Sequence, residues 1–176
     1  MLFQSTAIPG VVIIRPKRFE DKRGFFARVW ERDVFEEHGM NAEIVQCSSS
    51  FNSRKGTLRG MHFQSEPYAE AKFVRCVRGA MFDVALDLRT ESPTFKKWFG
   101  VELSGENGDA LYIPEGCAHG FLTLEEATEV FYMITAPYAP EAAGGVRFND
   151  PAFRIEWPGK VMVINERDAS YSDFFG

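Results

Sequence analysis

The sequence has few of the residues from which disulfide frameworks and metal clusters are built. It contains three cysteines and three histidines among 176 residues. The cysteines, Cys47, Cys76 and Cys117, are widely spaced, odd in number and form no CxxC pair. This pattern argues against both a disulfide framework and a zinc site. We therefore expect all three to serve as small, mostly buried hydrophobic residues.

Long apolar runs and an excess of positive charge are also missing. The first ten residues, MLFQSTAIPG, have neither a basic start nor a continuous apolar stretch, and no later stretch approaches the roughly 20 apolar residues of a membrane span. The formal net charge of −5 argues against nucleic-acid binding, although it leaves room for a local basic pocket for a small anion. The sequence predicts a soluble cytoplasmic protein without nucleic-acid or membrane partners.

Repeats, low-complexity tracts and Ser/Gly linkers are absent as well, so we expect one domain over residues 1–176. Short β-rich runs separated by Gly, Pro, Asn and Ser indicate an antiparallel sandwich or barrel. The expected strands are 11–15, 24–30, 43–46, 57–63, 72–77, 81–88, 98–103, 110–113, 120–124 and 128–134. The one good helix candidate is 31–38, which Gly39 would end.

Two of these strands carry polar side chains in informative places. In 81–88, alternation separates Asp83 and Asp87 from an apolar face of Phe82, Val84, Leu86 and Leu88. The two carboxylates would line the inside of a barrel or face solvent, and the pattern leaves both open. In 128–134, Tyr132 shares a face with Thr128, Val130 and Ile134, as a core residue or as part of a cavity wall.

Two segments resemble the conserved motifs of cupin barrels. Residues 108–119 have the spacing G-x5-P-x-G-x2-H, which resembles the second cupin motif and ends at His119. Residues 56–64 resemble the first motif, in which two histidines separated by one residue bind a metal. Here His62 occupies the first position, but the second is Gln64. Because a neutral amide is a poor replacement for imidazole, we predict a cupin barrel without the metal.

Without a metal, His62 is available as a proton acceptor, because imidazole titrates near working pH. A lone histidine is usually structural, but Arg59 precedes His62 by three residues and Lys72 follows by ten. Strict alternation would place Arg59 and His62 on opposite faces of the strand. A β-bulge at Gly60 would bring both side chains into one cavity.

Further motifs make the resemblance specific over nearly the whole chain. Together with 56–64 and 114–121, the sequence resembles the dTDP-4-dehydrorhamnose 3,5-epimerase family in the segments DKRGFF (21–26), KFVRCVRG (72–79), FDVALDLR (82–89), SPTF (92–95), YAPE (138–141), NDP (149–151) and WP (157–158), and in Asp168. The resemblance implies an all-β, cupin-type jelly roll with a few short helices, a homodimer and no cofactor. It also implies acid–base epimerisation at C3, C5 or both of a nucleotide-linked 4-keto-6-deoxy sugar, in deoxysugar or surface-polysaccharide biosynthesis.

The resemblance also implies roles for individual residues. Four would be catalytic: His62 as base, Asp168 as its orienting partner, Tyr132 as opposing acid and Lys72 as the group that holds the enolate oxygen. The substrate-binding residues would be Arg23 and Arg59 on the diphosphate, His119 and Asp83 in the cavity, and Gln46, Phe26 and Tyr138 near the nucleotide. Structural roles are the alternative for each: surface ion pairs for the arginines, a core position for the tyrosine and a solvated tail for the aspartate at position 168.

The sequence departs from the family pattern at four positions. Arg28 stands where the family commonly has Glu, and Ser48 where it often has Asn, so the base could be thymidine, guanosine or cytidine. Cys117 replaces a usual Phe and Pro137 a common Tyr, which would reshape the sugar pocket. Two other functions stay open at this point. One is a metal-dependent cupin isomerase or dioxygenase, and the other is a non-catalytic module that binds a sugar nucleotide.

Overall fold

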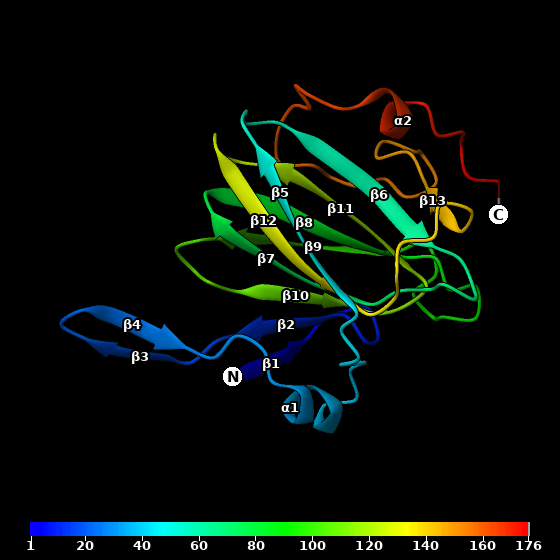
Figure 1. Cartoon of the computed structure of the whole chain (residues 1–176). Coiled ribbons are helices and arrows are strands. Elements are labelled where there is room, and N and C mark those ends of the chain that lie inside the picture. The colour runs from blue at the N-terminus through cyan, green and yellow to red at the C-terminus, as the bar shows by residue number, and fades with distance from the viewer. Residues whose placement is uncertain (176) are drawn as a thin grey trace.

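The strands pair as antiparallel neighbours in two large sheets and one separate hairpin (Figure 1). The computed structural model describes residues 1–175. In spatial order, the six-stranded sheet consists of β1 (Leu2–Ser5), β2 (Val12–Arg15), β10 (Ala110–Ile113), β7 (Lys72–Arg78), β12 (Thr128–Ile134) and β5 (Gln46–Asn52). The five-stranded sheet consists of β13 (Ala143–Gly145), β6 (Leu58–Gln64), β11 (Cys117–Thr123), β8 (Ala80–Asp87) and β9 (Trp98–Ser104).

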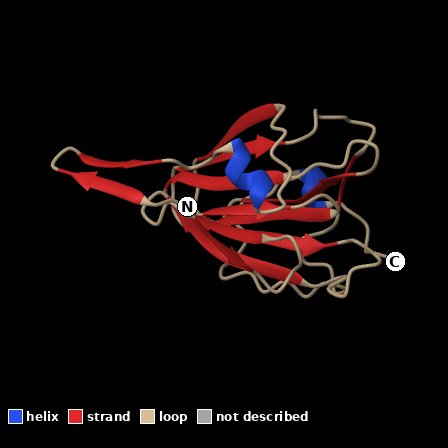
Figure 2. Cartoon of the chain, turned by 90° about the horizontal axis from the view of Figure 1, so that it is seen from below, coloured by secondary structure: helices blue, strands red, loops and turns tan. Residues whose placement is uncertain are grey.

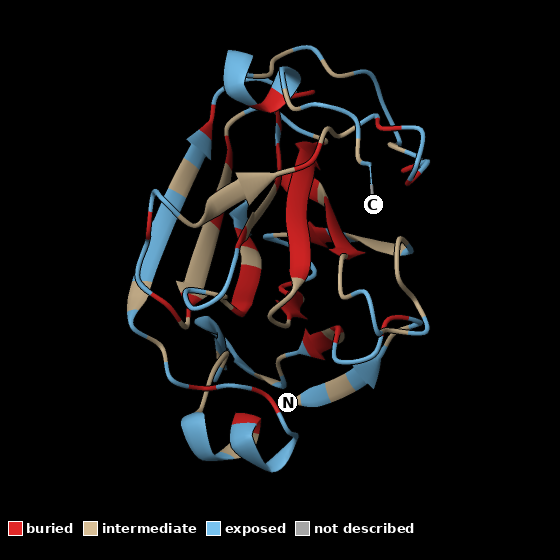
Figure 3. Ribbon diagram, turned by 90° about the vertical axis from the view of Figure 1, so that its right-hand side faces the viewer, coloured by how far each residue is buried: buried red, intermediate tan, exposed pale blue. Residues whose placement is uncertain are grey.

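The space between the two sheets is filled by side chains from both. Because side chains alternate along a strand, every second residue of β7, β8 and β12 points into this interior. Its main cluster includes the almost completely buried side chains of Val74, Met81, Leu111, Phe121 and Val130. Figure 3 shows buried strands at the centre and exposed segments around them. A polar side chain that enters this apolar interior therefore needs a hydrogen-bond partner.

The outer faces of both sheets are partly covered. On the six-stranded sheet, Phe35 of α1 (Arg32–Glu37) packs edge-on against Phe73 of β7, with ring centroids 5.6 Å apart. On the five-stranded sheet, Phe153 from the segment after β13 packs in one cluster with Val84 of β8. The chain then returns to β6 through the short helix α2 (Glu166–Ala169). The C-terminal segment is thereby brought back to the barrel.

The two-stranded hairpin of β3 (Arg18–Asp21) and β4 (Gly24–Ala27) projects away from both sheets (Figures 1 and 2). Three of its side chains, Phe19, Phe25 and Phe26, are more than half exposed. An isolated hairpin is marginally stable in water, and this one buries little of its apolar surface within the chain. Its phenylalanines are therefore available for contact with another surface.

The prediction of an all-β protein with few short helices is confirmed. The expected helix 31–38 is present as α1, and the expected separation of faces in β8 places Val84 and Leu86 in the outer cluster, opposite Met81 and Ala85. None of the helices in residues 1–175 has the length and apolar character that crossing a bilayer requires.

The sequence-based strand assignment was wrong in one place and incomplete in others. Residues 43–45 are irregular, and the strand begins at Gln46 and continues through the polar run of serines to Asn52. This strand, β5, lies at the edge of its sheet and is largely exposed, so hydrophobic alternation gives little sign of it. Four short elements with equally weak patterns were missed: β1, β3, β13 and α2.

Candidate active site

Strand β6 presents two functional side chains because of an irregularity at Gly60. His62 pairs with His119 of β11, whereas Arg59 pairs with Phe121, so the intervening segment is one residue longer on β6 than on β11. This is the bulge expected at that position. Gly60 has a φ of +128°, and a Cβ atom there would lie 2.5 Å from the backbone of β11. Glycine is therefore required at this point of the strand.

His62 and Asp168 form a hydrogen-bonded pair although they are far apart in sequence. The Nε2 atom of His62 lies 2.8 Å from Oδ1 of Asp168, and the backbone N–H of Gly60 donates to Oδ2 at 3.0 Å. The Asp168 side chain is 1% exposed, whereas the His62 side chain is 41% exposed. The side chain of Asn165 accepts from the Asp168 N–H and caps α2. The cap and the two hydrogen bonds fix the carboxylate behind the imidazole.

The charge of Asp168 determines which nitrogen of His62 is free. Burial alone raises the pKa of this carboxyl, but hydrogen bonds from His62 and from the Gly60 N–H outweigh burial and lower the pKa overall. An ionised carboxylate only accepts hydrogen bonds, so the proton on Nε2 points toward Asp168. Nδ1 then carries the lone pair. This arrangement suits a general base that is oriented by a carboxylate.

Lys72, at the start of β7, shares a cavity of about 210 Å³ with His62. Its Nζ atom lies 2.5 Å from Oε1 of Glu70, and both side chains are 9% exposed. The cavity is lined by Gln46, His62, Phe63, Gln64, Glu70, Lys72, Ile134, Tyr138, Ala143, Gly144 and Arg167. Two cationic side chains, Lys72 and Arg167, thus face one carboxylate. Among the side chains that line the cavity, positive charges outnumber negative ones, although the chain as a whole is negative.

A second buried pair, His119 and Asp83, lies in the interior of the barrel. The Nε2 atom of His119 is 2.6 Å from Oδ1 of Asp83, and both side chains are almost completely buried. His119 is also the cross-strand neighbour of His62, and its ring meets the ring of Tyr132 edge-on with centroids 6.0 Å apart. The pair therefore connects the wall that carries His62 with the opposite wall that carries Tyr132.

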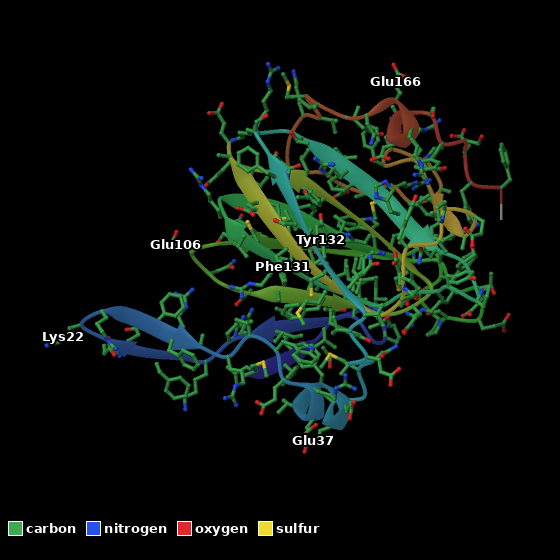
Figure 4. All side chains as sticks on the ribbon, in the orientation of Figure 1. Lys22, Glu37, Glu106, Phe131, Tyr132 and Glu166 are labelled. Carbon is green, nitrogen blue, oxygen red and sulfur yellow. The ribbon has the colours of Figure 1, made fainter. Side chains whose placement is uncertain are left out.

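Tyr132 lies in the middle of β12 and packs against the cluster between the sheets (Figure 4). Burial raises the pKa of its phenol well above the ordinary value, and the negative charge of Asp83 acts in the same direction. A hydrogen bond with Ser50 and the positive charge of Arg59 lower the pKa in part. The phenol consequently keeps its proton at neutral pH, which suits a proton donor.

Three further site candidates, Arg59, Gln46 and Tyr138, are held by hydrogen bonds, and Arg59 is not among the residues that line the cavity. The Nε of Arg59 donates to Oδ1 of the buried Asn52 at 2.8 Å, while the rest of the Arg59 side chain is exposed. Gln46 accepts from the backbone N–H of Tyr138 at 3.1 Å, and both residues line the cavity. The structure thus places Gln46, Tyr138 and Lys72 in one cavity.

Asp83 and Asp87, expected on one polar face, lie in different environments. Asp83 points into the interior, as described above, whereas Asp87 binds a loop outside the cavity. Its carboxylate accepts from the Arg89 side chain and from the hydroxyls of Ser92 and Thr94 at 2.5–2.9 Å. Asp87 ends β8, so the turn that follows supplies its partners. Its position at the end of the strand, more than its face, decides its surroundings.

Arg23 and Phe26 are not brought to this cavity within one chain. Arg23 is 84% exposed on the hairpin turn, where it pairs with Asp21 at 2.6 Å, and Phe26 is 67% exposed. In Figure 4, Lys22 marks the tip of this hairpin, well to one side of the ribbon that carries Tyr132. The two side chains line a separate surface hollow with the residues of the hairpin turn.

Gln64, which stands where the cupin motif has its second histidine, is fully engaged with backbone groups. Its amide donates to the carbonyls of Tyr68 and Pro137 and accepts from the N–H of Ala139 at 2.7 Å. The side chain therefore ties two loops together at the rim of the cavity. Within residues 1–175, no three His, Cys, Asp or Glu side chains gather in a way that could hold a metal ion.

The four departures from the family pattern also have definite places. Arg28 pairs with Glu31 at 3.0 Å on the surface, and Ser48 lies opposite Tyr132 on β5. The Cys117 thiol is buried in the core, where burial raises its pKa to about 12. Pro137 contributes the carbonyl that Gln64 binds. Of these, Ser48 and Pro137 lie next to residues assigned to the site.

The likeness to known proteins extends over the whole chain. The family profile described as dTDP-4-dehydrorhamnose 3,5-epimerase matches residues 5–175. A Sinorhizobium fredii protein of that name is 47% identical over 171 residues, covering 97% of this chain and 88% of its own length. The chain belongs to the dTDP-4-dehydrorhamnose 3,5-epimerase family. The resemblance inferred from the motifs is confirmed.

Solved structures of the epimerase family have the same fold as this chain. The Elizabethkingia anophelis dTDP-4-dehydrorhamnose 3,5-epimerase superposes with a TM-score of 0.95 at 40% identity, covering 99% of this chain and 96% of that chain. For a Legionella pneumophila dTDP-6-deoxy-D-glucose-3,5-epimerase in complex with dTDP-4-keto-L-rhamnose, the TM-score is 0.91 at 40% identity, with 97% and 90% covered. The cupin-type fold expected from the two motifs is confirmed with them.

Sequence reasoning missed three residues of this candidate site. Glu70 precedes Lys72 by two positions, a spacing that places both on one face of an extended chain and that could have revealed the pair. Asn52, which holds Arg59, lies on the strand that was assigned wrongly. Arg167 lines the cavity next to Asp168 in sequence, but its approach depends on the fold of the C-terminal segment.

Proposed function

We propose that this chain, folded as one domain, is a cofactor-independent epimerase of a nucleotide-diphosphate 4-keto-6-deoxy sugar. The reaction would invert C3, C5 or both, in deoxysugar or surface-polysaccharide biosynthesis. The single observation that carries the proposal is the His62–Asp168 pair, which opens onto the same cavity as the ammonium of Lys72. Membership of the epimerase family supports the same activity.

The chemistry needs a base, an acid and a stabilised oxyanion. A ketone at C4 acidifies the hydrogens on C3 and C5, so Nδ1 of His62 removes one of them as a proton. The electron pair passes into a planar enolate, and Lys72 donates a hydrogen bond to its oxygen. Tyr132 returns a proton to the opposite face of the carbon, which inverts it. A well-aimed oxyanion donor contributes roughly 3 kcal/mol and acid–base assistance about 100-fold to 10,000-fold, so all three groups are needed.

The opposed positions of His62 and Tyr132 support this division of roles. His62 belongs to the five-stranded sheet and Tyr132 to the six-stranded sheet, and His119 contacts the ring of Tyr132 from the strand next to His62. A sugar ring between these walls would meet the imidazole on one face and the phenol on the other. The His119–Asp83 pair would then support the wall of the cavity.

Binding of the nucleotide diphosphate is assigned to Arg59 and to two side chains that line the cavity. Arg59 presents an exposed guanidinium, whose planar fork can donate paired hydrogen bonds to phosphate oxygens. Gln46 and Tyr138 would contact the nucleoside. Arg28 reverses the charge of the family's usual carboxylate, so we propose that base recognition differs from the thymidine pattern. Guanosine and cytidine nucleotides belong in any substrate screen beside thymidine.

We also propose that the protein works in the cytoplasm as a homodimer in which the hairpin of each chain reaches the cavity of the other. Arg23 and Phe26 lie on a projecting hairpin with exposed phenylalanines, and the outer face of the six-stranded sheet exposes Phe51 and Val77. A second copy would cover these apolar groups and bring the partner's arginine to the diphosphate. The dimer would then complete the site.

Exchange with deuterium oxide tests the function. The chain is incubated in D₂O with thymidine, guanosine and cytidine diphosphate 4-keto-6-deoxy sugars, and the label at C3 and C5 is followed by NMR and mass spectrometry. Label at either carbon, with inversion, is expected for at least one nucleotide. Binding without exchange would instead indicate a sugar-nucleotide binding module. A stoichiometric transition metal in elemental analysis, lost together with activity on chelation, would indicate a metal-dependent cupin enzyme.

A further inference from the structure

Glu70 is a buried carboxylate of the cavity to which the epimerisation chemistry assigns no role. It lies two residues before β7, and its Oε1 atom is 2.5 Å from Nζ of Lys72. Each of the two side chains is 9% exposed. Among the described residues that line the cavity, Glu70 is the one acidic side chain. A specific contact of this kind, at the lysine expected to meet the reacting oxygen, calls for a functional explanation.

The electrostatic environment of Lys72 explains why a carboxylate is needed beside it. An ammonium removed from water is costly unless an opposite charge and hydrogen bonds compensate it. The neighbouring groups offer little compensation: His62 faces the cavity from β6, Tyr138 from the loop after β12, and Arg167 brings a second positive charge from α2. In the core, the buried thiol of Cys117 lies within electrostatic reach of Lys72. Glu70 therefore supplies the compensating charge.

The contact also limits where the ammonium can lie. A lysine ammonium has three N–H donors on a flexible stem, and it can shift within a cavity when nothing holds it. The charge-assisted hydrogen bond to Glu70 occupies one donor and leaves two. Both remaining donors are free to turn toward a ligand in the space that His62 also borders.

We propose that Glu70 is a positioning residue that holds the Lys72 ammonium, charged and oriented, against the oxygen that becomes negative during epimerisation. This inference rests on the proposed function, because it assigns Glu70 a part in the same reaction. Glu70 itself touches neither the sugar carbon nor the transferred proton. Its effect on the reaction passes through Lys72.

The test compares Glu70→Gln, Glu70→Ala and the matched control Glu66→Gln, an exposed glutamate in the same loop. Glutamine keeps the size and one acceptor oxygen but removes the charge, whereas alanine removes both. We expect kcat to fall about tenfold in Glu70→Gln and further in Glu70→Ala, as for loss of a charge-assisted hydrogen bond, with KM changed less than twofold. Glu66→Gln should match the wild type.

The double variant separates positioning from a general loss of structure. Lys72→Met removes the ammonium that Glu70 would hold. In that background, Glu70→Gln should cause no further loss of kcat.

The possible outcomes separate this inference from the proposed function. No exchange by the wild-type chain with any nucleotide sugar would defeat the proposed function. An active wild type with Glu70→Gln unchanged in kcat would defeat the positioning role alone. So would equal losses from Glu70→Gln in the presence and absence of Lys72. Thermal unfolding of every variant shows whether a lost activity reflects a lost fold, and the isosteric glutamine variant is the one on which the inference depends.

Discussion

The same three-residue pattern, Asp-x-Arg, occurs in the barrel and on the hairpin with opposite consequences. In the barrel, Asp87 is fully buried and binds Arg89, whereas on the hairpin Asp21 binds Arg23, which is 84% exposed. The first pair holds a loop against the sheet. The second leaves a guanidinium at the surface, facing no other part of its own chain that the structure describes. Local sequence thus makes the ion pair in both places, and the surroundings decide whether the pair is buried against a sheet or left at the surface.

The barrel and the hairpin as a whole differ in the same way, because one is tightly packed and the other is largely exposed. The catalytic candidates His62, Lys72, Tyr132 and Asp168 are held by two packed sheets and a capped helix. The hairpin carries Arg23 and Phe26 on two strands with little packing of their own. We infer that the barrel of one chain performs the chemistry, whereas the hairpin of the other chain contributes part of the substrate binding.

The largest effect is expected from His62→Ala, which removes the base from the barrel. Deuterium exchange should fall about 1,000-fold or more, within the range of general acid–base catalysis, because no neighbouring group replaces Nδ1. His38→Ala is the matched control, since His38 ends α1 and stacks on Phe3 away from the cavity. Near-normal exchange in the His62 variant would contradict the assigned role.

Two glycines with positive φ provide a matched test of rigidity. Alanine at Gly60 would place its Cβ 2.5 Å from the backbone of β11, whereas at Gly24, on the hairpin turn, a Cβ would meet no atom within 4 Å. Gly60→Ala should lower the free energy of unfolding by about 3 kcal/mol or more, and Gly24→Ala by about 1 kcal/mol from backbone strain alone. Urea unfolding curves measure both. Equal losses would mean that the two regions do not differ in packing.

Tyr132→Phe should separate proton removal from inversion. The phenol is lost with almost no change in shape, so epimerised product should form about 100-fold more slowly while exchange at carbon through His62 continues. NMR distinguishes label in unreacted sugar from label in inverted sugar. Tyr68→Phe, an exposed tyrosine, controls for the loss of a hydroxyl. If inversion and exchange fell in parallel, the phenol would not be the separate acid.

Subunit mixing tests whether the hairpin acts between chains. Arg23→Ala and His62→Ala should each form nearly inactive homodimers, the first through weakened diphosphate binding. After denaturation and refolding together, half of the dimers would pair one chain of each kind and contain one intact site, which restores about a quarter of wild-type activity. No recovery, with heterodimers demonstrated by mass spectrometry, would place Arg23 in its own chain's site or in none.

The sequence allowed prediction of the barrel because its central strands follow strong patterns. The family motifs also indicated His62, Lys72, Gln46 and Tyr138, which share one cavity in the structure. Alternation correctly separated the faces of β8 at Met81 and Val84, and the glycine at position 60 correctly indicated a bulge. Reasoning from one chain could not show that Arg23 lies outside the cavity, because a motif specifies a role without saying which copy performs it. Glu70 escaped notice because a two-residue spacing from a lysine is common in extended chains, and only the burial of both side chains distinguishes this pair.

The smallest effect concerns the two Asp-x-Arg pairs and acid stability. Burial raises the pKa of Asp87, but hydrogen bonds from Arg89, Ser92 and Thr94 outweigh burial and lower the pKa to about 2. A lowered folded-state pKa means that the stabilisation is complete above the unfolded value of about 4 and is lost as the pH falls through about 2. Asp87→Asn should therefore cost about 1–2 kcal/mol at pH 7 and progressively less below pH 4.

The matching variant on the hairpin is Asp21→Asn. The Arg23 side chain holds the pKa of Asp21 below its usual value too, but the pair is exposed and screened by water. Its replacement should leave the pH dependence of unfolding unchanged while weakening substrate binding, since Arg23 loses the partner that orients it. Urea titrations between pH 2 and pH 7, beside KM measurements, compare the two variants. A similar loss of stability in Asp87→Asn and Asp21→Asn would show that the hairpin pair is structural, and that the motif has the same role in both regions.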